Sequence, residues 1–191
     1  MRRTVLLFAI IITIISFILW NGSKNSPQKT TNAFLENIQK GKWKSASSYI
    51  ENLDAKEYFL EESQNKYNRV VFEKMEYKIG NKKKDDKQAT IDVQLTTIDK
   101  RKALDKVIDI VRKEVLEEAS VESRVVDSIP YLIKIAKSQS AEKVTIPVKL
   151  KLVKVGDQWK VDLTEEFMDA LTGTYDRSTD TDMIFERTDS N

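Results

Sequence analysis

The stretch VTIPVKLKLVKVGDQWKVDL, residues 144–163, contains the pattern that decides the fold. Apolar side chains alternate with polar ones along its first half, at Val144, Ile146, Val148, Leu150 and Leu152. Gly156-Asp157-Gln158 turns the chain, and the apolar positions resume at Trp159, Val161 and Leu163. A period of two with one apolar face predicts an antiparallel hairpin that covers a core on one side. Pro147 cannot donate to a strand ladder, so we expect an edge or a bulge there.

A second hairpin is predicted upstream, between residues 71 and 96. The first strand has its apolar positions at Val71, Met75, Tyr77 and Ile79. The second has them at Ala89, Ile91, Val93 and Leu95. The polar tip between the strands contains the run KKKDDK, residues 82–87. We interpret this run as a solvated turn, because short charge runs usually face water. The alternative is contact with an anionic wall polymer or a lipid head group.

Helices are predicted before the first hairpin and after the second. From Pro27 to Lys40 the apolar residues form one helical stripe, and Gly41 follows the last turn, where helices commonly end. A short second helix carries Trp43, Ala46, Tyr49 and Ile50. The run DAKE, residues 54–57, resembles a capping box and would open a third helix that reaches about Asn68. A last short helix is expected around Phe167, Met168 and Leu171.

The segment 99–138 returns to a helical period and forms a long insert between the two hairpins. A straight helix of this length would reach about 60 Å, compared with a radius of gyration of about 14 Å for the domain. It must therefore break or fold back, and Ser120 and Pro130 are the expected break points. We expect Leu104, Val107 and Val111 to be buried. The stretch after Ser120 is expected to be more exposed, which makes Val121, Val125 and Ile129 a candidate partner surface.

The N-terminus carries the clearest signal of location. After Arg2 and Arg3, the run TVLLFAIIITIISFILW from Thr4 to Trp20 has no charged residue. As a helix it would span about 25 Å, near the short end of a bilayer crossing. The arginines should stay in the cytoplasm and Trp20 should lie at the interface. The exit sequence lacks a good pair of small residues for signal-peptide cleavage, so retention is favoured over cleavage.

The composition narrows the possible functions. The 191 residues have no Cys and no His, which excludes disulfides and thiolate catalysis and removes the commonest metal ligand. Lys and Arg total 32 and Asp and Glu 30, for a net charge of +2, so a basic face for nucleic acid is not indicated. The length suits one domain. We predict an anchor over residues 1–22, a tether over 23–28, an α+β domain over 29–172 and a polar, disordered tail over 173–191.

This order of elements resembles the cystatin-like α+β cone of the nuclear-transport-factor-two-like superfamily, in particular small membrane-anchored members from Gram-positive bacteria. The likeness covers roughly residues 28–165. It is carried by Ala33-Phe34-Leu35, Ile38, Gly41-Lys42-Trp43 and Ala46, and then by 153–157 and Trp159-Lys160-Val161. The resemblance implies helices on a curved antiparallel sheet of about four strands. It transfers no function, because that superfamily includes enzymes, ligand-binding domains and assembly modules.

A cone of this kind can enclose a pocket, and its candidate wall residues are Trp43, Tyr49, Tyr77 and Trp159. The competing interpretation is that these aromatic side chains fill the core. An isomerase-like site would need an inward carboxylate, but Glu76 and Asp92 fall on the polar face of the strands. No catalytic, metal or cofactor residues are therefore assigned, and we expect the chain not to be an enzyme.

Two functional hypotheses follow from these observations. The leading one is a non-enzymatic, single-pass, extracytoplasmic module that binds other proteins of a bacterial envelope assembly, for example a secretion or conjugation complex. The alternative is an extracytoplasmic protein that binds a small apolar ligand or peptide in the cone, including an immunity or stress-response role. A filled cone with an exposed apolar patch on the insert would favour the first hypothesis, and an open apolar pocket would favour the second.

Overall fold

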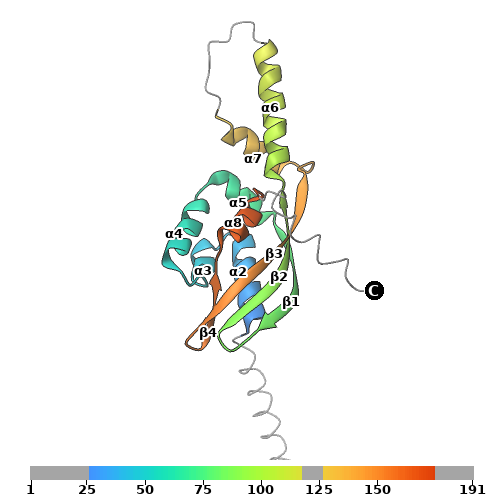
Figure 1. Cartoon of the computed structure of the whole chain (residues 1–191). Helices are drawn as coiled ribbons and strands as arrows, with labels where there is room; N and C mark the ends of the chain where they lie inside the picture. Colours follow the sequence, from blue (N-terminus) through green and yellow to red (C-terminus); the bar gives the residue numbers. More distant parts are fainter. Residues whose placement is uncertain (1–25, 118–126, 175–191) are drawn as a thin grey trace, which may run out of the picture.

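The computed structural model describes residues 26–117 and 127–174, and it shows an α+β fold (Figure 1). Four antiparallel strands form one sheet in the order β1-β2-β3-β4. The strands are β1 (Glu76–Lys84), β2 (Gln88–Ile98), β3 (Lys143–Val155) and β4 (Gln158–Asp162). The predicted class and the four-stranded antiparallel sheet are confirmed. The predicted span Thr4–Trp20 and most of the predicted tail lie outside the described residues.

The apolar alternation of β2, β3 and β4 is confirmed. Ala89, Ile91, Val93 and Leu95 are buried on β2, and Trp159 and Val161 on β4. The register between β2 and β3 runs without interruption from Gln88↔Val153 to Ile98↔Lys143. Pro147 therefore lies in no bulge. It pairs with β2 on one side, and the pairing of β3 with β4 begins only at Lys151, so the proline occupies an edge position as expected.

The first strand begins later than predicted. Val71 belongs to helix α5 (Lys66–Glu73), not to the hairpin, and β1 starts only at Glu76. Val71 and its neighbour Phe72 are both fully buried, which suits a helix packed on two sides but not the alternation of a half-buried strand. Tyr77 and Ile79 do point inward and are half-buried. The register of β1 against β2 then shifts between Ile79 and Lys82.

The helices before the sheet are α2 (Pro27–Gln39), α3 (Trp43–Ser47), α4 (Leu53–Glu62) and α5. The helix α2 begins before the predicted domain boundary, with the Ser26 hydroxyl capping it, and Gly41 follows it with a positive φ of 65°. The predicted capping box is wrong. The Asn52 side chain accepts hydrogen bonds from the N–H groups of Asp54 and Ala55 at 2.8 and 3.1 Å. Asn65 caps α5 in the same way, so the single helix that we predicted is two.

The main core lies between the sheet and these helices. Helix α2 contacts β1, β2 and β4, and the last helix α8 (Glu165–Thr172) contacts β2, β3 and α5. The largest side chains fully buried in this core include Phe34, Phe59, Phe72 and Phe167. Phe167, Met168 and Leu171 point inward from α8, which confirms the predicted final helix. Figure 1 shows α2, α3, α4, α5 and α8 on one side of the sheet.

The insert folds back on itself as expected. It consists of α6 (Lys100–Glu117) and α7 (Ile129–Lys137), which we call the arm. Pro130 lies in the first turn of α7, where its missing N–H costs no helical hydrogen bond. The arm extends from the end of the sheet where β2 stops and β3 starts (Figure 1). Ser120, Val121 and Val125 lie outside the described residues.

Candidate interaction surfaces

The four aromatic residues considered as a pocket wall pack in or against the main core. Trp159 is 4% exposed and belongs to the buried cluster. Trp43 packs against Phe72 with the ring centroids 5.6 Å apart, and Tyr49 is half-buried against the same cluster. The Tyr77 hydroxyl donates to a side-chain amide of α2 at 2.9 Å, and burial raises the pKa of this tyrosine. These contacts account for all four as packing residues.

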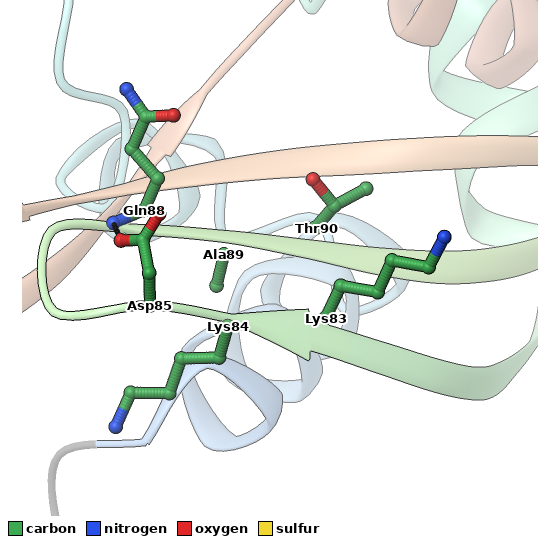
Figure 2. Close-up of a pocket in the computed structure, with 6 residues that line it drawn as sticks. All are labelled: Lys83, Lys84, Asp85, Gln88, Ala89 and Thr90. Carbon is green, nitrogen blue, oxygen red and sulfur yellow. Dashed lines mark hydrogen bonds between the residues drawn. The ribbon is translucent and has the colours of Figure 1, made fainter.

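A hollow of about 300 Å³ lies instead at the tip of the β1–β2 hairpin (Figure 2). It is lined by Lys83, Lys84, Asp85, Gln88, Ala89 and Thr90. Within the turn the Asp85 carboxylate accepts the N–H groups of Lys87 and Gln88 at 2.7 and 2.6 Å, which holds the pKa of Asp85 below its usual range. The lining is therefore polar and open to solvent, unlike a site for an apolar ligand.

The base of the arm is fixed to the domain by apolar contacts and hydrogen bonds. A second buried cluster joins α5, the end of β2 and the two arm helices, through Tyr67, Val71, Ile98, Ala103, Val107, Leu132 and Ala136. The Lys74 ammonium donates to the carbonyls of Ala136 and Lys137 at 2.7 and 2.9 Å, at the C-terminal end of α7 where a cation is favourable. An ion pair of 2.9 Å joins Lys106 on α6 to Glu142 before β3.

Further along the arm, the Tyr131 hydroxyl donates to the Glu114 carboxylate at 2.8 Å. This hydrogen bond joins the first turn of α7 to the distal half of α6, and it raises the pKa of Tyr131. The two helices of the arm are thus joined by this hydrogen bond near the start of α7 and by the buried cluster that Leu132 and Ala136 share with Ala103 and Val107. The described part of the arm is a packed helical pair and not a single extended helix.

The outer side of the arm exposes apolar side chains. Leu104 and Ile108, one turn apart on α6, are 37% and 54% exposed. Ile129, the first residue of α7, is 43% exposed. The prediction that Leu104 is buried is wrong, whereas Val107 is buried as expected and Val111 packs partly against the second cluster. The short helix α7 covers the side of α6 that carries Ala103 and Val107, and Leu104 lies about 100° further round the helix.

On α6, Ile108 is exposed although the sequence reasoning did not single it out; Leu53, Tyr58 and Val155 are exposed elsewhere in the described residues. A signal for Ile108 is present in the sequence. Apolar residues of α6 occur in adjacent pairs, at 103–104, 107–108, 110–111 and 115–116. Such pairs make an apolar face wider than one short helix can cover. We call the exposed part of this face, Leu104 and Ile108, the arm stripe.

The described residues contain no group of three or more acidic side chains that could hold a metal ion. Glu76 and Asp92 are exposed on the outer face of the sheet, as the alternation predicted, and Glu76 forms an ion pair with Lys143 at 2.5 Å. Nor is any helix within the described ranges both long and apolar enough to cross a membrane. In comparisons with known proteins, no family model, curated protein or solved structure matched the chain.

Proposed function

We propose that this chain is a non-enzymatic, membrane-anchored, extracytoplasmic module that binds another protein of a bacterial envelope assembly through its arm. The observation that carries the proposal is the arm stripe, in which two large aliphatic side chains remain 37% and 54% exposed on a packed helix. Exposed apolar groups that cluster on one surface commonly mark an interaction site. The uncharged run Thr4–Trp20 supports the anchored part of the proposal.

The arrangement of the arm also supports this role. Its base is fixed by a buried cluster, an ion pair and the hydrogen bonds of Lys74, so the stripe is presented on a preorganised element. A rigid surface loses less conformational entropy on binding than a flexible one. The arm projects from the end of the sheet opposite the hairpin tips (Figure 1). Four antiparallel strands covered by helices on one side also support the proposed relationship to the cystatin-like cone superfamily.

The test is recovery of partners from native membranes. Full-length protein with Leu104→Glu and Ile108→Glu would be compared with the wild type and with Lys102→Gln plus Lys113→Gln. The control pair lies on the opposite, polar side of α6 and changes the net charge by the same −2. We expect the stripe variant to melt within about 2 °C of the wild type, because both sites are exposed. It should lose a protein that the wild type and the control both retain.

If the stripe variant recovers the same proteins in the same amounts as the control, the arm stripe is not the binding surface. Val107→Glu is the reference for a folding defect, because Val107 is 4% exposed and a carboxylate buried there costs several kcal/mol. A stripe variant that unfolds as Val107→Glu does would show that the stripe completes the core.

A further inference from the structure

The end of the sheet opposite the arm is strongly basic. It holds the tip of the β1–β2 hairpin and the β3–β4 turn, which lie side by side because Gln88 pairs with Val153. The segments 82–88 and 151–160 together contain seven lysines and three aspartates. Their net charge of +4 exceeds the +2 of the whole chain, so the remainder of the chain is net negative. We call this surface the basic end.

The basic end is also the end from which the chain continues toward its N-terminus. The Gln39 side chain, at the last residue of α2, donates to the carbonyl of Met75 just before β1 at 2.6 Å. About two turns earlier in α2, the Asn32 side chain accepts a hydrogen bond from the Tyr77 hydroxyl at 2.9 Å. Earlier residues of α2 thus lie further along β1, and Pro27 is directed toward the hairpin tip. Figure 1 shows the start of α2 level with the two hairpin ends.

The lysines of the tip point to both sides of the hairpin. In Figure 2, Lys83 lies on one face of the ribbon, while Lys84 projects from the other, toward the start of α2. The Lys84 ammonium lies 5.4 Å from the centroid of the Trp159 ring, which gives it a cation–π contact. Asp85 directs its carboxylate onto the backbone N–H groups of the turn. A flat anionic surface that meets the hairpin end-on would therefore find ammonium groups on both of its faces.

We propose that the basic end docks on the anionic lipid head groups of the membrane that holds residues 4–20. This inference rests on the anchored part of the proposed function. Residues 21–26, fully extended, reach at most about 21 Å. This six-residue segment therefore keeps the basic end close to the bilayer, where anionic head groups attract each nearby lysine and improve binding about five-fold per charge. The arm stripe then points away from the membrane, toward a partner.

The experiment measures the distance of the basic end from the lipid surface. Because the chain has no native cysteine, Gln158→Cys at the basic end and Gln139→Cys at the base of the arm each give one labelling site. Both positions are exposed and uncharged. Full-length variants would be reconstituted in vesicles of phosphatidylcholine, with or without phosphatidylglycerol, that contain a quencher lipid. A membrane-impermeant dye would then be attached from outside.

With phosphatidylglycerol, we expect quenching at 158 to be about two-fold stronger than in phosphatidylcholine alone, and quenching at 139 to stay weak. The difference should vanish in 1 M salt, where the screening length is about 3 Å. Replacing Lys82, Lys83 and Lys87 by Gln should abolish it. Replacing Lys113, Lys134 and Lys137 of the arm by Gln should leave it unchanged.

Equal quenching in neutral and anionic vesicles, with the chain firmly inserted in both, would overturn the lipid inference and leave the anchor intact. Equal loss of quenching in the two lysine triplets would also overturn it, because the effect would then depend on net charge and not on the basic end. A chain that can be washed from both kinds of vesicle would instead refute the anchored part of the proposed function.

Discussion

Gly173 ends α8 with a φ of +71°, the left-handed conformation that glycine adopts without steric cost. A Cβ atom at this position would lie 2.1 Å from the carbonyl oxygen of Ile98, which is a backbone atom at the end of β2. The Gly173 carbonyl also accepts the N–H of Lys100, the first residue of α6, at 3.3 Å. One glycine thus allows the last helix, the central strand and the arm to meet.

The Gly173→Ala variant should be destabilised by at least about 3 kcal/mol, because left-handed strain adds to a backbone clash. Urea denaturation measures the free energy of unfolding directly. Gly156→Ala is the matched control, since its φ is +58° but no atom lies within 4 Å of the added Cβ. It should lose only the conformational term, about 1 to 2 kcal/mol. Equal losses in the two variants would mean that the contact with Ile98 carries no energy.

At the scale of the elements, the sequence predicts well wherever one face of an element is buried and the other is wet. The strands β2, β3 and β4 and the helices α2 and α8 were predicted for this reason. The predictions are wrong where an element is packed on two sides, or where the side chain of one residue caps a helix and so divides an apolar stretch. Helix α5 is packed on two sides, with Val71 in the second buried cluster and Phe72 in the main core, and Asn65 divides one apparent helix by capping the next. Neither effect changes the hydrophobic period by which elements are recognised.

The same limit applies to the arm. The sequence predicts that the insert must fold back, because its length exceeds the size of the domain. It does not show which side of α6 the short helix α7 covers, since Ala103, Leu104, Val107 and Ile108 all belong to one broad apolar face. Only the packing of Leu132 and Ala136 against Ala103 and Val107 separates the buried side from the exposed one.

Tyr67 on α5 lies in the buried cluster that joins the arm to the rest of the domain. Its side chain is buried, its hydroxyl has no hydrogen-bond partner among the described residues, and burial raises its pKa to about 12. Because the folded-state pKa lies above the unfolded value of 10, the neutral phenol stabilises the fold below pH 10, and this contribution is lost as the pH rises toward 12. The wild type should therefore lose stability over this window.

Tyr67→Phe should remove this part of the pH dependence. At pH 7 the variant should equal the wild type or exceed its stability by up to about 1 kcal/mol, because an unpaired buried hydroxyl is removed. Between pH 10 and 12 its advantage should grow, and urea denaturation at several pH values measures the difference. The other tyrosines are present in both proteins, so what they contribute to the pH dependence cancels in the difference. Parallel curves would show that the phenol is solvated in the folded state.

At the scale of the molecule, the two ends of the described domain differ in chemistry. The basic end lies beside the start of α2 and carries a net charge of +4 in segments 82–88 and 151–160. The arm at the other end carries the exposed Leu104 and Ile108, and its base is held by a buried cluster and by the ion pair of Lys106. If residues 4–20 cross the membrane, the six residues 21–26 place the basic end at the lipid surface and direct the arm outward. The anchor would then lie in the membrane, the basic end at its surface, and the arm on the far side of the domain from the membrane.

A chain that begins at Ser26 should separate the anchor from the domain. Ser26 retains the cap of α2. The first buried residue of the described domain is Pro27, so the shortened chain keeps all the buried residues of that domain. We therefore expect this chain to be soluble and to unfold cooperatively, whereas the full-length chain should stay with membranes through a high-salt wash and keep its N-terminus. A chain that begins at Ala33 should not fold, because it also loses the cap and the buried Thr30 and Thr31. Fractionation, N-terminal sequencing and thermal melts measure these outcomes. A full-length protein that is recovered with its N-terminus between residues 21 and 29 would show that the apolar run is a cleaved signal peptide.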